Sequence, residues 1–147
     1  LPIQADIFAN LKAIVPGVRD VSWVESGGPM NLIIQLDKKV EGEPLRAAMA
    51  AMSLSNFIKQ EIVVDQDIAI GNLKQVMWAI STRVQADRDV NILKNIQGQV
   101  LDPSIAEEIS GSGMVIDATK PVGAPFAIKA QPPEELVRKI RIADYIS

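Results

Sequence analysis

The strongest constraint on the fold is a strand–helix–strand pattern in the middle of the sequence. Residues 62–65 are a short apolar run that ends in an acid, which is typical of a buried strand. Residues 72–84 carry apolar side chains at helical spacing, and residues 89–93 return to a strand pattern. Two parallel strands joined by a helix form a right-handed crossover. We therefore expect an α/β fold in which these three segments form a βαβ unit.

The flanking patterns add further strands and helices to this unit. Residues 18–24 and 31–36 have strand patterns on either side of a Gly-Gly-Pro turn, so they predict an antiparallel hairpin with a longer loop. Helices are expected over residues 3–15, 45–52, 104–110 and from 132 onward, with loops over 95–103 and 122–131. Residues 1–147 thus predict a single α/β domain: a mixed sheet with a βαβ crossover, helices packed on the sheet, and a terminal amphipathic helix.

Composition excludes several kinds of catalytic site. The 147-residue chain contains no cysteine and no histidine, so by itself it cannot form a disulfide, a thiolate zinc site, or a Ser-His-Asp or Cys-His triad. Its net charge of −3 argues against an electrostatic surface for nucleic acid. No apolar run approaches the ~20 residues of a membrane span. The chain begins at Leu1 rather than Met, which indicates a fragment, a processed piece or a disordered start.

Residues 111–121 contain the clearest candidate binding groups. The two glycines at the start of this stretch allow a backbone turn, and residues 114–117 have the pattern of a short strand. Thr119 and Lys120 then place a hydroxyl and an ammonium group where this strand ends. Because ligands of open α/β sheets bind beyond the carboxyl ends of the strands, one interpretation is a ligand-binding edge. The alternative is a purely structural turn and strand.

Three other features have both a functional and a structural interpretation. The alanine-rich segment 45–52 permits close approach of a neighbour, which is either another subunit or the chain's own sheet. Asp65 and Asp67 lie between a strand and a helix, so they either bind a cation together or favour the helix start electrostatically. The basic residues of segment 138–141 form either a phosphate site or a solvated helix face.

Six segments spread along the chain match, in order, the pattern of a known family. They are Val15-Pro16-Gly17-Val18-Arg19-Asp20-Val21, Ile62-Val63-Val64-Asp65-Gln66-Asp67, Gln75-Val76-Met77-Trp78-Ala79-Ile80-Ser81-Thr82-Arg83-Val84, Asp87-Arg88-Asp89-Val90, Leu101-Asp102-Pro103-Ser104 and Ile116-Asp117-Ala118-Thr119-Lys120-Pro121. With these segments the chain resembles the carboxy-terminal domain of the UbiD family. Members of that family are prenylated-FMN-dependent, non-oxidative decarboxylases and carboxylases. The resemblance covers nearly the whole chain.

The resemblance implies that this chain is one part of a larger enzyme. Full-length members are much longer, and they hold prenylated FMN, a divalent metal and a monovalent cation mainly on preceding domains. Those domains also supply the catalytic residues, so we expect no catalytic residue here. The chain is then a carboxy-terminal domain or a separate small subunit, with a flavin-binding portion in cis or in trans. A homo-oligomer, a cytoplasmic location and a small aromatic or unsaturated acid as substrate are further expectations.

Within this chain, the resemblance implies that the domain shapes the substrate side of the cleft and contributes to oligomer contacts. Met114, Ile116 and Thr119 are the candidates for lining the substrate pocket, with Lys120 at its rim. In such chemistry the cofactor is the electron sink and the protein positions the substrate. Many relatives have Ser-Lys-Met where this chain has Ser112-Gly113-Met114, so Gly113 replaces the lysine that lies near the cofactor in the family.

A different class of function is the alternative. It is a stand-alone, non-catalytic interaction module with the same fold, whose contact surfaces are the alanine-rich helix and the terminal helix. A flavin-binding UbiD portion encoded in the same or the adjacent reading frame distinguishes the enzyme part from the module. A nucleotide-binding domain is not supported, because the turn over residues 66–71 lacks a glycine-rich phosphate loop.

Overall fold

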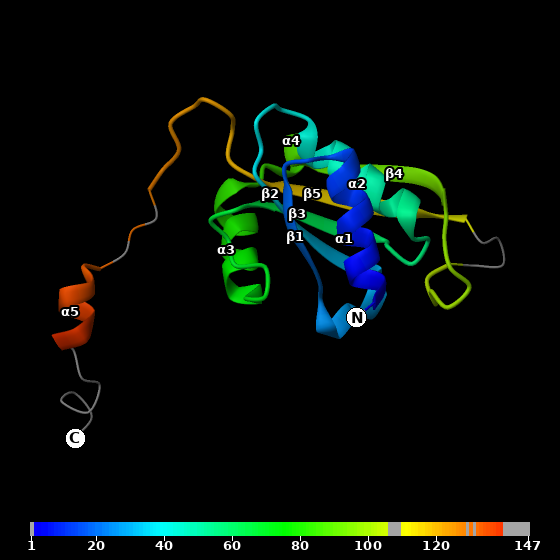
Figure 1. Ribbon diagram of the computed structural model, residues 1–147, viewed down its shortest axis with the longest axis horizontal. Coiled ribbons are helices and arrows are strands. Elements are labelled where there is room, and N and C mark those ends of the chain that lie inside the picture. Colours follow the sequence, from blue (N-terminus) through cyan, green and yellow to red (C-terminus); the bar gives the residue numbers. More distant parts are fainter. Residues whose placement is uncertain (1, 106–109, 129, 131, 140–147) are drawn as a thin grey trace, which may run out of the picture.

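One five-stranded sheet, with strand order β1-β2-β3-β5-β4, organises the fold (Figure 1). The computed structural model describes residues 2–105, 110–128, 130 and 132–139. Strands β2, β3 and β5 are parallel, and the edge strands β1 and β4 are antiparallel to their neighbours. In chain order the elements are α1 (Pro2–Ile14), β1 (Val18–Trp23), the 3-10 helix η1 (Glu25–Met30), β2 (Asn31–Leu36), α2 (Glu43–Leu54), β3 (Gln60–Asp65), α3 (Leu73–Arg83), α4 (Ala86–Asp89), β4 (Val90–Gln97), β5 (Ser110–Ala118) and α5 (Glu134–Lys139).

Local signals set the ends of the helices. The side chain of Asn72 caps α3 by accepting hydrogen bonds from the backbone N–H groups of Lys74 and Gln75. Helix α2 begins with Pro44 in its first turn, where the missing N–H has no helical partner to lose. None of the described helices is both long and apolar enough to cross a membrane.

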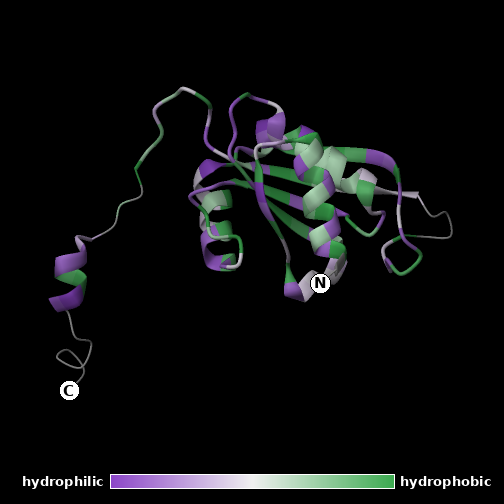
Figure 2. Ribbon diagram, in the orientation of Figure 1, coloured by the Kyte–Doolittle hydropathy of each residue, from purple (hydrophilic) through white to green (hydrophobic). Residues whose placement is uncertain are grey.

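Hydrophobic residues are frequent in the central strands (Figure 2). Alternation along these strands sends their side chains to both faces of the sheet, where they form two apolar layers. Helices α1 and α2 cover one face, and α3 covers part of the other. The first layer includes Leu11, Leu32, Ile34, Val63 and Val115; the second includes Ile33, Val64, Val76, Ala79 and Ala118. The alanines Ala47, Ala48 and Ala51 are fully buried in the first layer. Their close neighbours are therefore elements of the same chain, which supports packing on the chain's own sheet for these three residues, and the subunit contact of segment 45–52 stays a prediction.

The predicted fold class is confirmed, but the crossover lies elsewhere in the chain. The structure has a mixed α/β sheet, and β2, α2 and β3 form the parallel βαβ unit. The expected unit over residues 62–93 is wrong, because β4 is antiparallel to β5 and β5 lies between β3 and β4. A short apolar run predicts a strand but carries no information about which strand it pairs with.

The start of β5 also differs from expectation. Residues 110–113 are extended and pair with β4, so the predicted turn is wrong. A Cβ at Gly113 would lie 2.9 Å from side-chain carbons of Met52 and Ile96, so this glycine permits close packing rather than a turn. Strand β4 continues to Gln97 past a register shift at Asn95, whose φ is 57°, where a loop was expected.

Two predicted helices are only partly visible. The core of the expected short helix over residues 104–110 lies outside the described residues. The terminal helix is described over Glu134–Lys139, and Leu136 and Val137 on its predicted apolar stripe are about half exposed.

Glu61 is a charged residue type inside the first apolar layer. It lies on β3 opposite Leu32 of β2 and Val115 of β5, and it has no solvent exposure. Within the described part of the chain, neither of its carboxyl oxygens has a hydrogen-bond partner. Burial raises the pKa of Glu61 from 4.5 to about 9. This residue is therefore a neutral carboxylic acid at neutral pH, because an unpaired buried charge is far more costly.

We expect the free energy of unfolding to fall as pH rises from about 4.5 to about 9. Over this interval the unfolded chain has released the Glu61 proton while the folded chain still holds it. The slope from this group is at most about 1.4 kcal/mol per pH unit. Urea unfolding of wild type and Glu61→Gln across this pH range measures the contribution of Glu61 to the pH dependence. Glu25→Gln is the control, because Glu25 is exposed. An identical pH dependence for wild type and Glu61→Gln would contradict a neutral Glu61.

Core packing gives a second stability prediction. Val64 on β3 is fully buried under α3, so Val64→Ala should leave a cavity and lower the free energy of unfolding by about 2 kcal/mol. Val40→Ala is the matched control because Val40 is 62% exposed. Its effect should stay below about 0.5 kcal/mol in the same denaturation experiment. Equal losses for the two variants would show that the second layer is not a packed core.

Candidate functional site

The carboxyl ends of the three parallel strands lie together at one edge of the sheet. In the parallel register Leu36 of β2 is opposite Asp65 of β3, and Val64 is opposite Ala118 of β5. The segments that follow these strands therefore meet at this edge, which is where open α/β sheets bind ligands.

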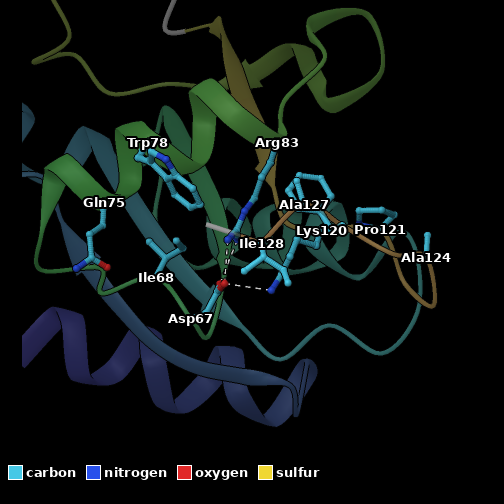
Figure 3. Close-up of a pocket in the computed structure, with 11 residues that line it drawn as sticks. Asp67, Ile68, Gln75, Trp78, Arg83, Lys120, Pro121, Ala124, Ala127 and Ile128 are labelled. Carbon is cyan, nitrogen blue, oxygen red and sulfur yellow. Dashed lines mark hydrogen bonds and ion pairs between the residues drawn. The ribbon is translucent and has the colours of Figure 1, made fainter. Parts of the chain in front are cut away.

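An ion-pair network joins the ends of β3, α3 and β5 (Figure 3). Arg83 Nη1 lies 2.8 Å from Asp65 Oδ2, and Arg83 Nη2 lies 2.9 Å from Asp67 Oδ2. Lys120 Nζ lies 3.0 Å from Asp67 Oδ2, and the Lys120 backbone N–H donates to Asp65 Oδ2 at 2.8 Å. These four residues tie the loop after β3 and the segment after β5 to the last residue of α3.

Arg83 is the buried centre of this network. Its side chain is 2% exposed, and its guanidinium lies 5.3 Å from the ring centroid of Trp78 and 5.9 Å from that of Phe126. Burial raises the pKa of Asp65, although the Lys120 N–H and the Arg83 charge oppose that rise. Burial acts in the same direction on Asp67, but hydrogen bonds from Arg83 and Lys120 outweigh it and lower the pKa of Asp67. The arginine is therefore held between two carboxyl groups and two aromatic rings.

This arrangement does not fit a metal ion or a flavin phosphate. The carboxylates of Asp65 and Asp67 already face Arg83 and Lys120, so the cation-binding interpretation of the pair has no support. No group of three or more acidic side chains that could hold a metal occurs among the described residues. A phosphate placed here would meet the same two carboxylates. Cofactor and metal binding therefore need residues other than these.

Two of the cavities that open at this edge share part of their lining. The first cavity has a volume of about 450 Å³ and is bordered by Asp67, Gln75, Trp78 and Lys120, among others. The second cavity has a volume of about 660 Å³ and is bordered by Lys38, Glu41, Arg88, Asp89, Asp117 and Thr119, among others. Arg83, Pro121 and Phe126 border both cavities. The segment 121–128 thus separates two hollows, with Phe126 above the Arg83 guanidinium.

Polar groups around the second cavity are also paired. Asp117 Oδ1 accepts hydrogen bonds from the backbone N–H and the hydroxyl of Thr119, at 2.9 and 2.5 Å. Burial raises the pKa of Asp117, and these two hydrogen bonds oppose the rise. Arg88 donates to both carboxylate oxygens of Asp89 and lowers the pKa of Asp89.

The predicted site residues do not form one cluster. Lys120 borders the first cavity, and the buried Thr119 borders the second. Met114 and Ile116 are partly buried and border neither cavity. Strand alternation puts them on the sheet face that carries Ala118, opposite to Val115 and Asp117.

Sequence reasoning missed Arg83, Trp78 and Phe126 as site residues. Arg83 and Trp78 were expected only as parts of a helix, and Phe126 lies in a segment without periodicity. The sequence does place an arginine at the end of the helix that follows Asp65 and Asp67, but this is only a weak indication of an ion pair. Whether the helix end lies close to the strand end is decided by the tertiary structure.

The comparisons with known proteins agree with this architecture. Residues 1–118 match the family of the 3-octaprenyl-4-hydroxybenzoate carboxy-lyase C-terminal domain, UbiD_C. The chain is 39% identical over 124 residues to an anhydromevalonate phosphate decarboxylase of Aeropyrum pernix, covering 84% of this chain and 28% of the relative. It is 33% identical over 147 residues to a phenolic acid decarboxylase of Sedimentibacter hydroxybenzoicus, covering 98% of this chain and 28% of that protein.

Solved structures of UbiD-class enzymes are also similar to this chain. The UbiD-class enzyme HmfF of Pelotomaculum thermopropionicum, in complex with FMN, matches with a TM-score of 0.83 and 35% identity, over 98% of this chain and 32% of that chain. An evolved dimeric form of the same enzyme contains prFMN and matches with a TM-score of 0.74, 33% identity and coverage of 98% and 29%. This chain spans less than a third of the length of each of these proteins. The chain therefore belongs to the UbiD family, in which it corresponds to the carboxy-terminal domain.

Proposed function

We propose that this chain is the carboxy-terminal domain, or a separate small subunit, of a UbiD-like non-oxidative decarboxylase or carboxylase. Its substrate is a small acid, either an aromatic acid or a phosphorylated acid such as the two kinds named for the relatives. The domain lines one side of the substrate cleft, and a flavin-binding portion in cis or in trans completes it. Cytoplasmic location is part of the same proposal.

The observation that carries this proposal is the pair of cavities at the carboxyl edge of the parallel strands. They are lined by positioned polar and aromatic side chains, yet the ion pairs at this edge leave no fit for a metal or a flavin phosphate. This is what a domain requires if it positions a substrate while another portion holds the reactive cofactor. Prenylated FMN, a divalent metal and a monovalent cation are accordingly assigned to that other portion.

Met114 and Ile116 support a contact role rather than a substrate role. Ile92 and Val90 of β4 pair with Met114 and Ile116 of β5, so the four apolar side chains share one sheet face. Helix α3 covers the part of this face around Ala118, and Ile92 remains 54% exposed. An apolar face of this kind is typical of an interface. We propose that it contacts the flavin-binding portion or another copy of the chain in the oligomer, and this observation also favours the alternative of an interaction module.

We expect the isolated chain to be colourless and inactive, and an assembly with its flavin-binding portion to release carbon dioxide from an acid substrate. The reason is that the proposal assigns the acid–base residues and the cofactor to the flavin-binding portion, while the carboxylates of Asp65 and Asp67 are already paired with Arg83 and Lys120. The measurement is carbon dioxide release by chain, partner and assembly, each supplied with prenylated FMN. Equal activity with and without this chain would contradict a role in the cleft, and activity of the chain alone would contradict the assignment of the cofactor.

The apolar face gives a separate prediction. Ile92→Glu should weaken binding to the flavin-binding portion by about tenfold or more, because association would bury the new charge. Ile14→Glu is the control, since Ile14 is similarly exposed at 43% but lies on α1, on the other side of the sheet. Analytical ultracentrifugation or calorimetry of the assembly measures the difference. If Ile92→Glu binds as well as wild type, the face is not the contact surface for the flavin-binding portion.

A further inference from the structure

We propose that residues 124–128 form a movable wall of the first cavity, which turns about Gly123 and is held shut by Phe126. The first cavity is the hollow of about 450 Å³ beside Trp78 and Arg83. The inference deepens the proposed function, because a wall that opens and closes controls the entry of a substrate to this side of the cleft. The motion itself rests only on contacts within this chain.

The part of the segment that precedes Gly123 is fastened to the domain. Lys120 is tied to the carboxylates that follow β3, through its backbone N–H and its ammonium group. Two residues later the Val122 N–H donates to Glu41 Oε1 at 2.6 Å, and this hydrogen bond is the main reason why the pKa of Glu41 is lowered. Residues 120–122 therefore give a fixed base from which the rest of the segment can turn.

Residues 124–128 have far fewer attachments. Within the described part of the chain, no backbone-to-backbone hydrogen bond involves any of them. Phe126 is partly buried and the others are exposed. The ring centroid of Phe126 lies 5.9 Å from the Arg83 guanidinium, a distance at which a cation and a ring attract each other. Because Arg83 is itself fixed between two carboxyl groups, this contact is a latch with one stationary half.

Gly123 lies between the fixed base and the latched part, where a hinge is needed. Its φ is 68°, in the left-handed region that a residue with a side chain adopts only at a cost. A Cβ added at Gly123 would meet no atom within 4 Å, so alanine would disfavour the observed backbone without a clash. Hinges of moving loops are a few residues that absorb a change in φ and ψ. Alanine at this position therefore tests the hinge without removing a contact.

The wall faces a rigid side of the cavity. Figure 3 shows the labelled wall residues across the cavity from Trp78 of α3, and α3 packs on the second apolar layer. Turning of the wall therefore changes the width of the first cavity, and it moves the Phe126 ring that also borders the second cavity. The wall residues that line the first cavity are Ala124, Phe126, Ala127 and Ile128.

Fluorescence of this chain tests the motion. The chain has no cysteine, so Ile128→Cys accepts a single bimane label at a position that is 95% exposed. In a Trp23→Phe background, Trp78 is the only tryptophan that can quench this label on contact. Phe126→Ala and Gly123→Ala should each raise the bimane fluorescence at least about twofold, because the open population grows and the label moves away from Trp78.

Two further variants are the controls. Trp78→Phe gives the fully unquenched reference. Gly71→Ala should leave the signal unchanged, because Gly71 has no left-handed φ and a Cβ added there would also meet no atom within 4 Å. Urea unfolding checks that the domain stays folded, since Phe126 and Gly123 lie outside both apolar layers. Unchanged bimane fluorescence in Phe126→Ala would remove the latch, unchanged fluorescence in Gly123→Ala would remove the hinge, and either result overturns the inference.

A cross-link in the assembled enzyme separates this inference from the proposed function. Gln75→Cys on α3 and Ala127→Cys on the wall, which border the same cavity, are joined by a cleavable bismaleimide. Turnover of an acid substrate should fall at least about tenfold and return when the linker is cleaved. Each single-cysteine variant treated with the same reagent is the control and should keep its turnover.

The outcomes of the two experiments are distinct. If the assembly never releases carbon dioxide but the bimane signal responds as expected, the proposed function fails and the movable wall stands. If the cross-linked assembly turns over as fast as the assembly without the linker, the wall does not control entry and the inference fails while the proposed function stands.

Discussion

The parallel pairing of β3 with β5 is the constraint on which the site depends. This pairing puts the end of β3 beside the end of β5, although the two strands are separated by more than 40 residues of sequence that include α3, α4 and β4. As a result the Lys120 N–H reaches Asp65 across 55 positions of the chain, and the Lys120 ammonium reaches Asp67. Without this register, the polar residues that follow the two strands would not form a common edge.

Arg83 holds the segments at that edge together. A single buried guanidinium contacts two carboxyl groups and two aromatic rings, which come from the loop after β3, from α3 itself and from the segment after β5. Because its charge is compensated locally, the network is compatible with burial. The same contacts give both Asp65 and Asp67 a cationic partner.

The main structural features of the chain lie at different places on the sheet. The parallel strands and the helices packed on them form the hydrophobic core. This core contains one buried, unpaired carboxylic acid, the neutral Glu61, on the face of the sheet covered by α1 and α2. The cavities lie at the carboxyl edge, and an apolar patch on β4 and β5 remains on the other face. The buried Glu61, the cavities and the exposed apolar patch thus lie at separate places in the fold, and the chain spans less than a third of the length of these relatives.

The sequence by itself determined the element types, because short-range periodicity and capping residues act within a few positions of the chain. It predicted β2 over residues 31–36 with its exact bounds, and it predicted a helix over residues 72–84, where α3 lies. It also predicted the family, because the order of motifs along a chain can be read from the sequence alone. It also drew attention to Asp65, Asp67, Thr119 and Lys120. Strand pairing, however, is set by long-range packing, so only the tertiary structure placed β5 between β3 and β4 and turned Gly113 from an expected turn into a close contact. Only the tertiary structure could show that Arg83 and Phe126 border both cavities and that Met114 and Ile116 border neither, because a one-residue alternation decides which face of the sheet a side chain joins.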